Sequence, residues 1–131
     1  MDAARLDDLV RKHGILLAVQ FGSSVSGQMY ASSNIDIAVL LERAPDSLAA
    51  YADLIADFQA LVPGREVDLA LINRADPLFL RKITEHCRLL HGPIHRLHEL
   101  KIYAFKRYQD HRRFLAIERE YVAGKIEALA R

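Results

Sequence analysis

The sequence predicts one α/β domain (α+β in the wider sense), in which a small mixed β-sheet of about four strands is flanked by helices. Short apolar runs alternate with longer segments of helical periodicity, which is the pattern of a sheet covered by helices. The length of 131 residues fits a single domain with one core. From residue 96 the periodicity is helical almost to the end. We therefore expect residues 1–95 to form the core and residues 96–131 to add a C-terminal helical segment of the same domain.

The first part of the chain predicts one helix and two strands around a polar turn. Residues 3–12 place apolar side chains on one helical face, and Gly14 ends this helix. The nearly continuous apolar run 15–21 predicts a strand that is covered on both faces. A turn rich in Gly and Ser, Gly22 to Gly27, leads into a short helical turn and a polar loop. The apolar run 35–41 predicts the second strand.

The rest of the core alternates in the same way, and its boundaries carry recognisable capping residues. Asp46 and Ser47 are candidates for a helix N-cap, and Pro63-Gly64 ends that helix. Asp76-Pro77 opens another helix, with the acid as cap and the proline at the first helical position. The expected elements are a helix at 47–62, a strand at 66–72, a helix from 76 to about 86 and a strand at 87–91.

The C-terminal segment carries two apolar stripes at helical spacing. The first, which we call the inner stripe, consists of Leu97, Leu100, Ala104, Tyr108, Leu115, Val122, Ile126 and Leu129. The second, which we call the outer stripe, consists of Tyr103, Phe114, Ile117 and Tyr121. We expect one stripe to pack on the sheet. The other needs a second helix or a partner to cover it, so this segment is the expected partner or oligomer interface.

The composition excludes several classes of partner. The chain is 51% hydrophobic and 27% charged, as in an ordinary globular protein. A formal net charge of +1 gives no overall field that attracts nucleic acid or an anionic membrane, so we expect neither. Cys87 is the single cysteine, which excludes an internal disulfide and predicts a reducing, cytoplasmic location. No apolar run approaches the ~20 residues that span a bilayer, and the charged first residues lack the apolar core of a signal peptide.

Acidic side chains stand on two otherwise apolar strands. Because side chains two apart share a face, Asn34 and Asp36 point the same way, and Asp68 holds the equivalent place in the third strand. If the two strands are neighbours, Asp36 and Asp68 lie side by side. Acids in such places are costly unless they are hydrated, paired or bound to metal. Hard oxygen ligands of this type suit Mg²⁺ that is shared with phosphate oxygens.

The Gly22-Ser23 turn suits phosphate binding. Glycine lets the backbone come close to a phosphate, serine offers a hydroxyl, and nearby amide groups can hold the anion. The plainer alternative is an ordinary turn beside solvated strand ends. Gly-Ser alone is weak evidence, but it gains weight when joined to the two acid-bearing strands.

These residues resemble a known family. The segment FGSSVSGQMYASSNIDIAVLLE is similar to the signature of the minimal nucleotidyltransferases of the polymerase-beta superfamily, in which Gly-Ser is followed about ten residues later by Asp-x-Asp. The segment VDLALINRADPLFLRKITEHCRLLHG, residues 67–92, resembles the family's third-acid strand, the next helix and the last strand. The C-terminal YVAGKIEAL resembles the antitoxin branch, the partners of HEPN-domain toxins. The resemblance therefore implies a nucleotidyltransferase-like fold over nearly the whole chain.

The resemblance also implies roles for individual residues. Nucleotide binding falls on Gly22, Ser23, Ser24 and Gly27, and metal binding and catalysis fall on Asn34, Asp36 and Asp68. Asp36 would ligate Mg²⁺, and Asp68 would be the third acid, which positions or deprotonates the accepting hydroxyl. The implied reaction is a two-metal, in-line transfer of AMP from ATP, with release of pyrophosphate. In the antitoxin branch the acceptor is a tyrosine of a HEPN-family RNase toxin. The chain itself contains no His-x-Tyr, so it stands on the antitoxin side of such a pair.

Two positions depart from the family pattern. Residue 34 should be the first metal-binding Asp, and it is Asn. Loss of even an outer partner of a metal ligand costs roughly 10–100-fold in metal affinity or activity, and loss of a direct ligand should cost at least as much. Three explanations stay open: a naturally weakened enzyme, an antitoxin that acts only by binding and covering the toxin, or a laboratory substitution. Ser26 stands where the family often has a basic residue, so one phosphate contact is missing. A more distant alternative is transfer to a small molecule, for which so short a chain leaves little acceptor pocket.

Overall fold

A computed structural model describes residues 1–25 and 34–130. The helices are α1 (Ala3–His13), α2 (Leu48–Leu61), α3 (Pro77–Glu85) and α4 (Ile94–Ala130). The strands are β1 (Ile15–Phe21), β2 (Ile35–Leu41), β3 (Val67–Leu71) and β4 (Cys87–His91). Two short 3-10 helices, Gly22–Ser24 and Ile72–Arg74, follow β1 and β3 directly. The α/β class and the four expected strands are confirmed.

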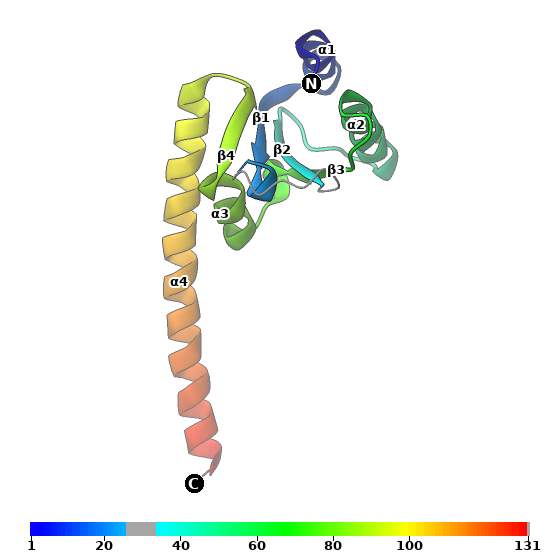
Figure 1. The fold of residues 1–131 in the computed structure, drawn as a ribbon. Helices are drawn as coiled ribbons and strands as arrows, with labels where there is room; N and C mark the ends of the chain where they lie inside the picture. Colours follow the sequence, from blue (N-terminus) through cyan, green and yellow to red (C-terminus); the bar gives the residue numbers. More distant parts are fainter. Residues whose placement is uncertain (26–33, 131) are drawn as a thin grey trace.

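The four strands form one mixed sheet in the order β3-β2-β1-β4. β1 runs antiparallel to both of its neighbours, and β2 pairs with β3 in parallel. The parallel pair is connected by α2, the usual crossover for parallel strands. Strand β3 therefore lies at one edge of the sheet, with β2 beside it (Figure 1).

Helices cover both faces of the sheet, so the domain has three layers. On one face the side chains of α1 and α2, led by Phe58, which has no exposed surface, pack on alternate residues of β2. The other face of the sheet packs on α3 and the first turns of α4, through residues such as Ile83 and Leu97. The alternation of β2 sends Ile35 and Ile37 to the first face. It leaves Asp36 on the second.

The helix boundaries follow the capping signals of the sequence. Ser47 caps α2 through its hydroxyl, and Asp76 caps α3 with Pro77 at the first helical position. Gly14 ends α1 in the left-handed conformation at φ 66°. Several boundaries differ from expectation: α4 begins at Ile94 rather than after residue 95, α2 and β3 are each one residue shorter at both ends, and the helical turn lies at the start of the Gly-Ser segment. The remainder of that segment, residues 26–33, is outside the described residues.

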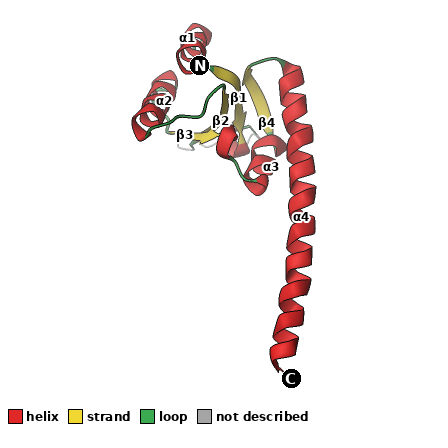
Figure 2. Cartoon of the chain, turned by 180° about the vertical axis from the view of Figure 1, so that it is seen from behind, coloured by secondary structure: helices red, strands yellow, loops and turns green. Residues whose placement is uncertain are grey.

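Helix α4 has 37 residues, a length of roughly 55 Å, and only its first half belongs to the globular body (Figure 2). Leu97 and Ala104 of the inner stripe are buried against α3 and the sheet. Further along the same stripe, Val122, Ile126 and Leu129 are exposed, because the helix has run past the core. The expectation that this stripe packs on the sheet therefore holds only for its first half. None of the helices in the described part of the chain is long and apolar enough to cross a membrane.

Candidate active site

Asp36 and Asp68 stand next to each other across the parallel strand pair. They are register partners in the β2–β3 ladder, each the second residue of its strand. Both point to the face covered by α3, because Ile35 and Val67 beside them belong to the opposite core. Asp36 is half-buried and Asp68 is exposed. The strands are neighbours, as the sequence analysis required for a shared acidic site.

Asn34 lies at the same end of the sheet and contacts this pair. Its side-chain Nδ2 donates a hydrogen bond to Oδ2 of Asp68 at 3.1 Å. A carboxylate only accepts hydrogen bonds, so the NH₂ group of Asn34 must face Asp68. The three residues of the expected metal set are therefore adjacent, but the amide nitrogen of Asn34 is already hydrogen-bonded to Asp68.

The electrostatics at Asp36 favour a bound cation. Burial raises the pKa of the Asp36 carboxyl, and the negative charge of Asp68 raises it further. Lys82 on α3 opposes this shift and lowers the pKa. A divalent cation between two carboxylates would remove their repulsion, and carboxylate oxygens are the ligands that Mg²⁺ prefers. The donor set therefore fits Mg²⁺, with Asp36 and Asp68 as its charged ligands.

Lys82 is a neighbour of the site that the sequence analysis missed. Lys82 lies on the exposed face of α3, while Leu80 and Ile83 lie on the buried face of the same helix. The sequence indicates which residues of this helix are buried but not which strand end the helix crosses. The placement of α3, and with it the position of the Lys82 ammonium near Asp36, comes only from the folded structure.

The Gly22-Ser23 turn follows β1 and meets Asp36 directly. Gly22 has φ 77°, and a Cβ built on it would lie 2.8 Å from Oδ2 of Asp36. Its N–H donates to the carbonyl of His86, so this amide is already used. Ser23 is exposed, and with Ser24 it belongs to the 3-10 helix after β1. Glycine is therefore required here on two grounds, its positive φ and the close approach of the acid.

We predict that Gly22→Ala weakens binding of Mg²⁺ and a non-hydrolysable ATP analogue, because the new methyl group displaces the Asp36 carboxylate. The positive φ adds a stability cost of roughly 1–2 kcal/mol. Gly64→Ala is the matched control, since Gly64 has φ 88° and open space around its Cβ position. Calorimetric binding and thermal melting of both variants check this. Equal loss of binding in the two would show that the contact with Asp36 does not matter.

Gly27, the last expected nucleotide-binding residue, lies outside the described residues, as does Ser26. The structure thus brings Gly22, Asn34, Asp36 and Asp68 to one end of the sheet. The roles of all these residues remain predictions.

An open cavity of about 410 Å³ lies along the β3 edge. Ala70, two residues after Asp68 and on the same face, contributes to its wall together with Tyr51 of α2 and Phe79 of α3. The volume is within the range of small-molecule sites. Neither Asp36 nor Asp68 belongs to the lining of this cavity.

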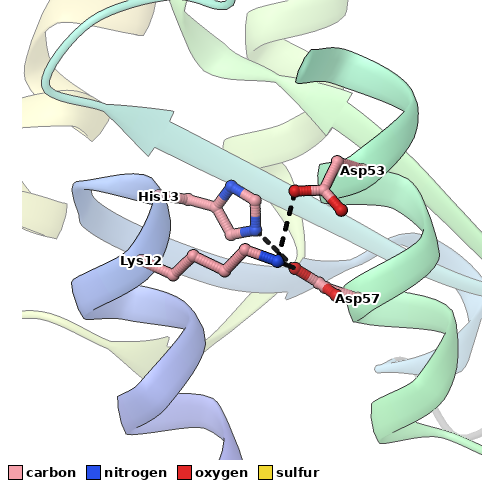
Figure 3. Close-up of polar contacts among 4 residues, drawn as sticks. All are labelled: Lys12, His13, Asp53 and Asp57. Atoms are coloured by element: carbon pink, nitrogen blue, oxygen red, sulfur yellow. Dashed lines mark hydrogen bonds and ion pairs between the residues drawn. The ribbon is translucent and has the colours of Figure 1, made fainter. Parts of the chain in front are cut away.

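A second polar cluster, which the sequence analysis did not anticipate, joins α1 to α2. In the described residues, one group of three His, Cys, Asp or Glu side chains converges closely enough to hold a metal ion, and it consists of His13, Asp53 and Asp57. Figure 3 shows them pointing toward one another, with Lys12 between the acids. The ammonium of Lys12 lies 3.2 Å from Asp53 and 2.9 Å from Asp57, and His13 Nε2 lies 2.7 Å from Asp57. Because Lys12 already supplies a cation, the arrangement fits an ion-pair cluster that ties two helices together.

We predict that Asp57→Asn destabilises the fold by about 1 kcal/mol at pH 7. The hydrogen bonds from Lys12 and His13 lower the pKa of Asp57. A lowered folded-state pKa gives stability that is present above the unfolded pKa of about 3.9 and is lost as pH falls through the folded one. The difference between wild type and variant should therefore shrink toward pH 3.

Chemical denaturation at pH 7 and pH 3 measures this effect. Asp53→Asn is the control, because Asp53 is more exposed and, in the described part of the chain, its one ion pair is with Lys12. It should cost less than Asp57→Asn at pH 7. A cost for Asp57→Asn that does not depend on pH would contradict the role given to the carboxylate.

A family model described as polymerase beta nucleotidyltransferase matches residues 5–93. This range contains every described residue of the candidate site. No curated protein matches the sequence.

Solved structures resemble this fold at low sequence identity. A toxin-antitoxin structure with AMP-PNP aligns with a TM-score of 0.73 and 22% identity, covering 97% of this chain and 99% of that chain. A complex of tri-AMPylated Shewanella oneidensis HEPN toxin with MNT antitoxin aligns with a TM-score of 0.65 and 21% identity, covering 95% of each chain. Spectinomycin adenyltransferase AAD(9) from Enterococcus faecialis, with ATP and spectinomycin, aligns with a TM-score of 0.55 and 15% identity over 74% of this chain and 57% of that one. At these identities the likeness establishes the shared fold.

Proposed function

Because the chain belongs to the polymerase beta nucleotidyltransferase family, we propose that it is an antitoxin that transfers AMP from ATP to a HEPN-domain RNase toxin and so neutralises it. The observation that carries the proposal is the register pairing of Asp36 and Asp68 on one face of the sheet, with Gly22 against Asp36. This pairing brings two hard ligands to the turn that suits a phosphate chain. The proposed cellular setting is the cytoplasm.

In the proposed mechanism each residue has a separate task. Asp36 and Asp68 hold Mg²⁺ through carboxylate oxygens, and Asn34 can offer only an amide oxygen. The Gly22 turn lets the backbone approach the phosphates, and the Ser23 hydroxyl binds one of them, with Ser24 and Gly27 as further nucleotide contacts. When bound, Mg²⁺ neutralises the phosphate charge and orients the attacking and leaving oxygens.

Asp68 is also suited to act on the acceptor. It is exposed at the edge strand, on the opposite side of Asp36 from the Gly22 turn. In an in-line displacement the attacking and leaving oxygens lie on opposite sides of the phosphorus. A leaving pyrophosphate near Gly22 therefore places the acceptor hydroxyl near Asp68, which can accept its proton. The acceptor is a tyrosine hydroxyl of the toxin.

A protein acceptor suits the shape of the chain. The acidic pair lies on the two strands at the β3 edge of the sheet, and the distal half of α4 leaves both apolar stripes largely exposed. Exposed apolar surface of this extent is typical of an interaction site. Solved toxin-antitoxin complexes with the same fold support a HEPN toxin as the occupant of this surface.

Transfer of label from ATP to the purified toxin tests the proposal. With Mg²⁺ and this chain, label in the α-phosphate should enter the toxin and label in the γ-phosphate should not. That pattern distinguishes AMP transfer from phosphorylation. Absence of α-label on a toxin that is still bound and inhibited would overturn the catalytic role.

A second candidate is an antitoxin that acts by binding alone. The hydrogen bond from Asn34 to Asp68 favours it, because this contact satisfies part of the acidic site without a metal. In that case the toxin is neutralised by coverage, and the acids of the site are dispensable for protection.

A further inference from the structure

The side chain of Asn34 is hydrogen-bonded to Asp68. Its Nδ2 donates to the carboxylate at 3.1 Å, across the end of the β2–β3 pair. With the amide nitrogen facing Oδ2 of Asp68, the amide oxygen of Asn34 points away from that carboxylate oxygen. The amide nitrogen has no lone pair to offer a cation, because its electrons are shared with the carbonyl group. In this orientation Asn34 is a partner of Asp68 and not a metal ligand.

The change from acid to amide also removes one charge from the site. Two carboxylates remain, and one of them, Asp68, is exposed to water and already hydrogen-bonded. The other, Asp36, is half-buried beside Gly22, and Lys82 adds a positive charge nearby. The missing third charge, the hydrogen bond on Asp68 and the positive charge of Lys82 each lower the affinity for a free divalent cation.

We infer that this chain binds its metal only together with the nucleotide, with Asn34 holding Asp68 until the triphosphate arrives. The inference rests on the proposed function. Triphosphate oxygens supply the charge and the ligands that Asn34 does not, and Mg²⁺ is commonly held by one or two carboxylates plus substrate phosphates. Rotation of the amide then exchanges the hydrogen bond for an oxygen contact. By linkage, metal and nucleotide raise each other's affinity by the same factor.

Binding of Mn²⁺ tests the inference with a readout that is independent of catalysis. Free Mn²⁺ is measured by electron paramagnetic resonance in titrations of wild type, Asn34→Asp and Asn34→Ala, each with and without AMP-PNP. Without nucleotide, Asn34→Asp should bind Mn²⁺ at least about 10-fold more tightly than wild type. Asn34→Ala should bind it no more weakly than wild type, since the amide is not a ligand in the metal-free site. With AMP-PNP, the affinity of wild type should rise by a larger factor than that of Asn34→Asp.

Thermal melting in EDTA provides a second readout. Asn34→Asp should melt below wild type, because a third carboxylate replaces a hydrogen-bond donor beside Asp68. Equal Mn²⁺ affinity of wild type and Asn34→Asp without nucleotide would overturn the inference while leaving the proposed function intact. Markedly weaker binding by Asn34→Ala without nucleotide would overturn it as well. Failure of every variant to bind Mn²⁺ with AMP-PNP would instead reject the proposed function, and this inference with it.

Discussion

Asp36→Ala and Asp68→Ala are each expected to reduce AMP transfer to the toxin at least about 100-fold, while the complex with the toxin still forms. Each substitution removes a charged metal ligand, and Asn34 cannot replace it. Neither residue contributes to the apolar cores, and the distal half of α4 extends beyond the globular body that holds them (Figure 2). Transfer is measured by toxin labelling, and complex formation by size-exclusion chromatography.

Asp7→Ala is a matched control for these variants, because Asp7 is an exposed acid on α1, across the sheet from the site. It should leave transfer unchanged. If Asp36→Ala and Asp68→Ala both protect cells from the toxin as well as wild type does, neutralisation depends on binding alone.

Loss of transfer in Asp36→Ala will not result from unfolding. The folded-state pKa of Asp36 is raised, chiefly by burial, so the ionised form opposes folding. Wild type therefore loses stability as pH rises above the unfolded pKa of about 3.9, and a variant without the carboxyl does not. In metal-free buffer the variant should melt at or above the wild-type temperature at pH 7, and this advantage should shrink toward pH 4.

The paired substitution Ile117→Asp and Tyr121→Asp is expected to weaken the toxin complex at least about 100-fold. Both residues belong to the outer stripe and are 65% and 64% exposed. A buried aromatic anchor such as Tyr121 commonly contributes about 2 kcal/mol or more to an interface, and a charge at Ile117 adds the cost of an unpaired buried charge, so the two changes together should remove most of the affinity. The stability of the chain itself should change by less than about 0.5 kcal/mol, because neither side chain packs on the core.

Ala116→Asp is the control on the same helix. Ala116 is exposed and belongs to neither stripe, so a charge there should leave the complex intact. Affinities from calorimetry and melting temperatures of the free chain decide the result. Undiminished binding by the paired variant would move the toxin interface to another surface.

Much of the fold follows from local patterns. The period of two in 35–41 and 66–72 sets which residues face which core, and the caps at Ser47 and Asp76 fix where helices begin. The adjacency of Asp36 and Asp68 requires only that their strands pair in parallel register. The alternation and the caps depend on near neighbours in sequence, which is why the sequence alone predicts them. The strand pairing is a long-range feature, which the sequence analysis stated only as a condition and the structure supplies.

Other features depend on tertiary placement and could not be predicted in this way. Both halves of the inner stripe have the same helical spacing, and only the size of the core shows that Val122 lies beyond it. The contact between His13 and Asp57 joins residues 44 apart in sequence. The hydrogen bond from Asn34 to Asp68 depends on side-chain orientation at two strand ends. No sequence motif encodes these two contacts or the point on α4 at which the core ends.

The intact mass of the cognate toxin, after incubation with ATP, Mg²⁺ and this chain, tests the central claim most directly. The account predicts a mass increase by one or more AMP units, and faster addition by the Asn34→Asp variant, whose third acid strengthens the metal site. An unmodified toxin that both proteins still bind and inhibit would contradict it, and would identify the chain as an antitoxin that acts by binding alone.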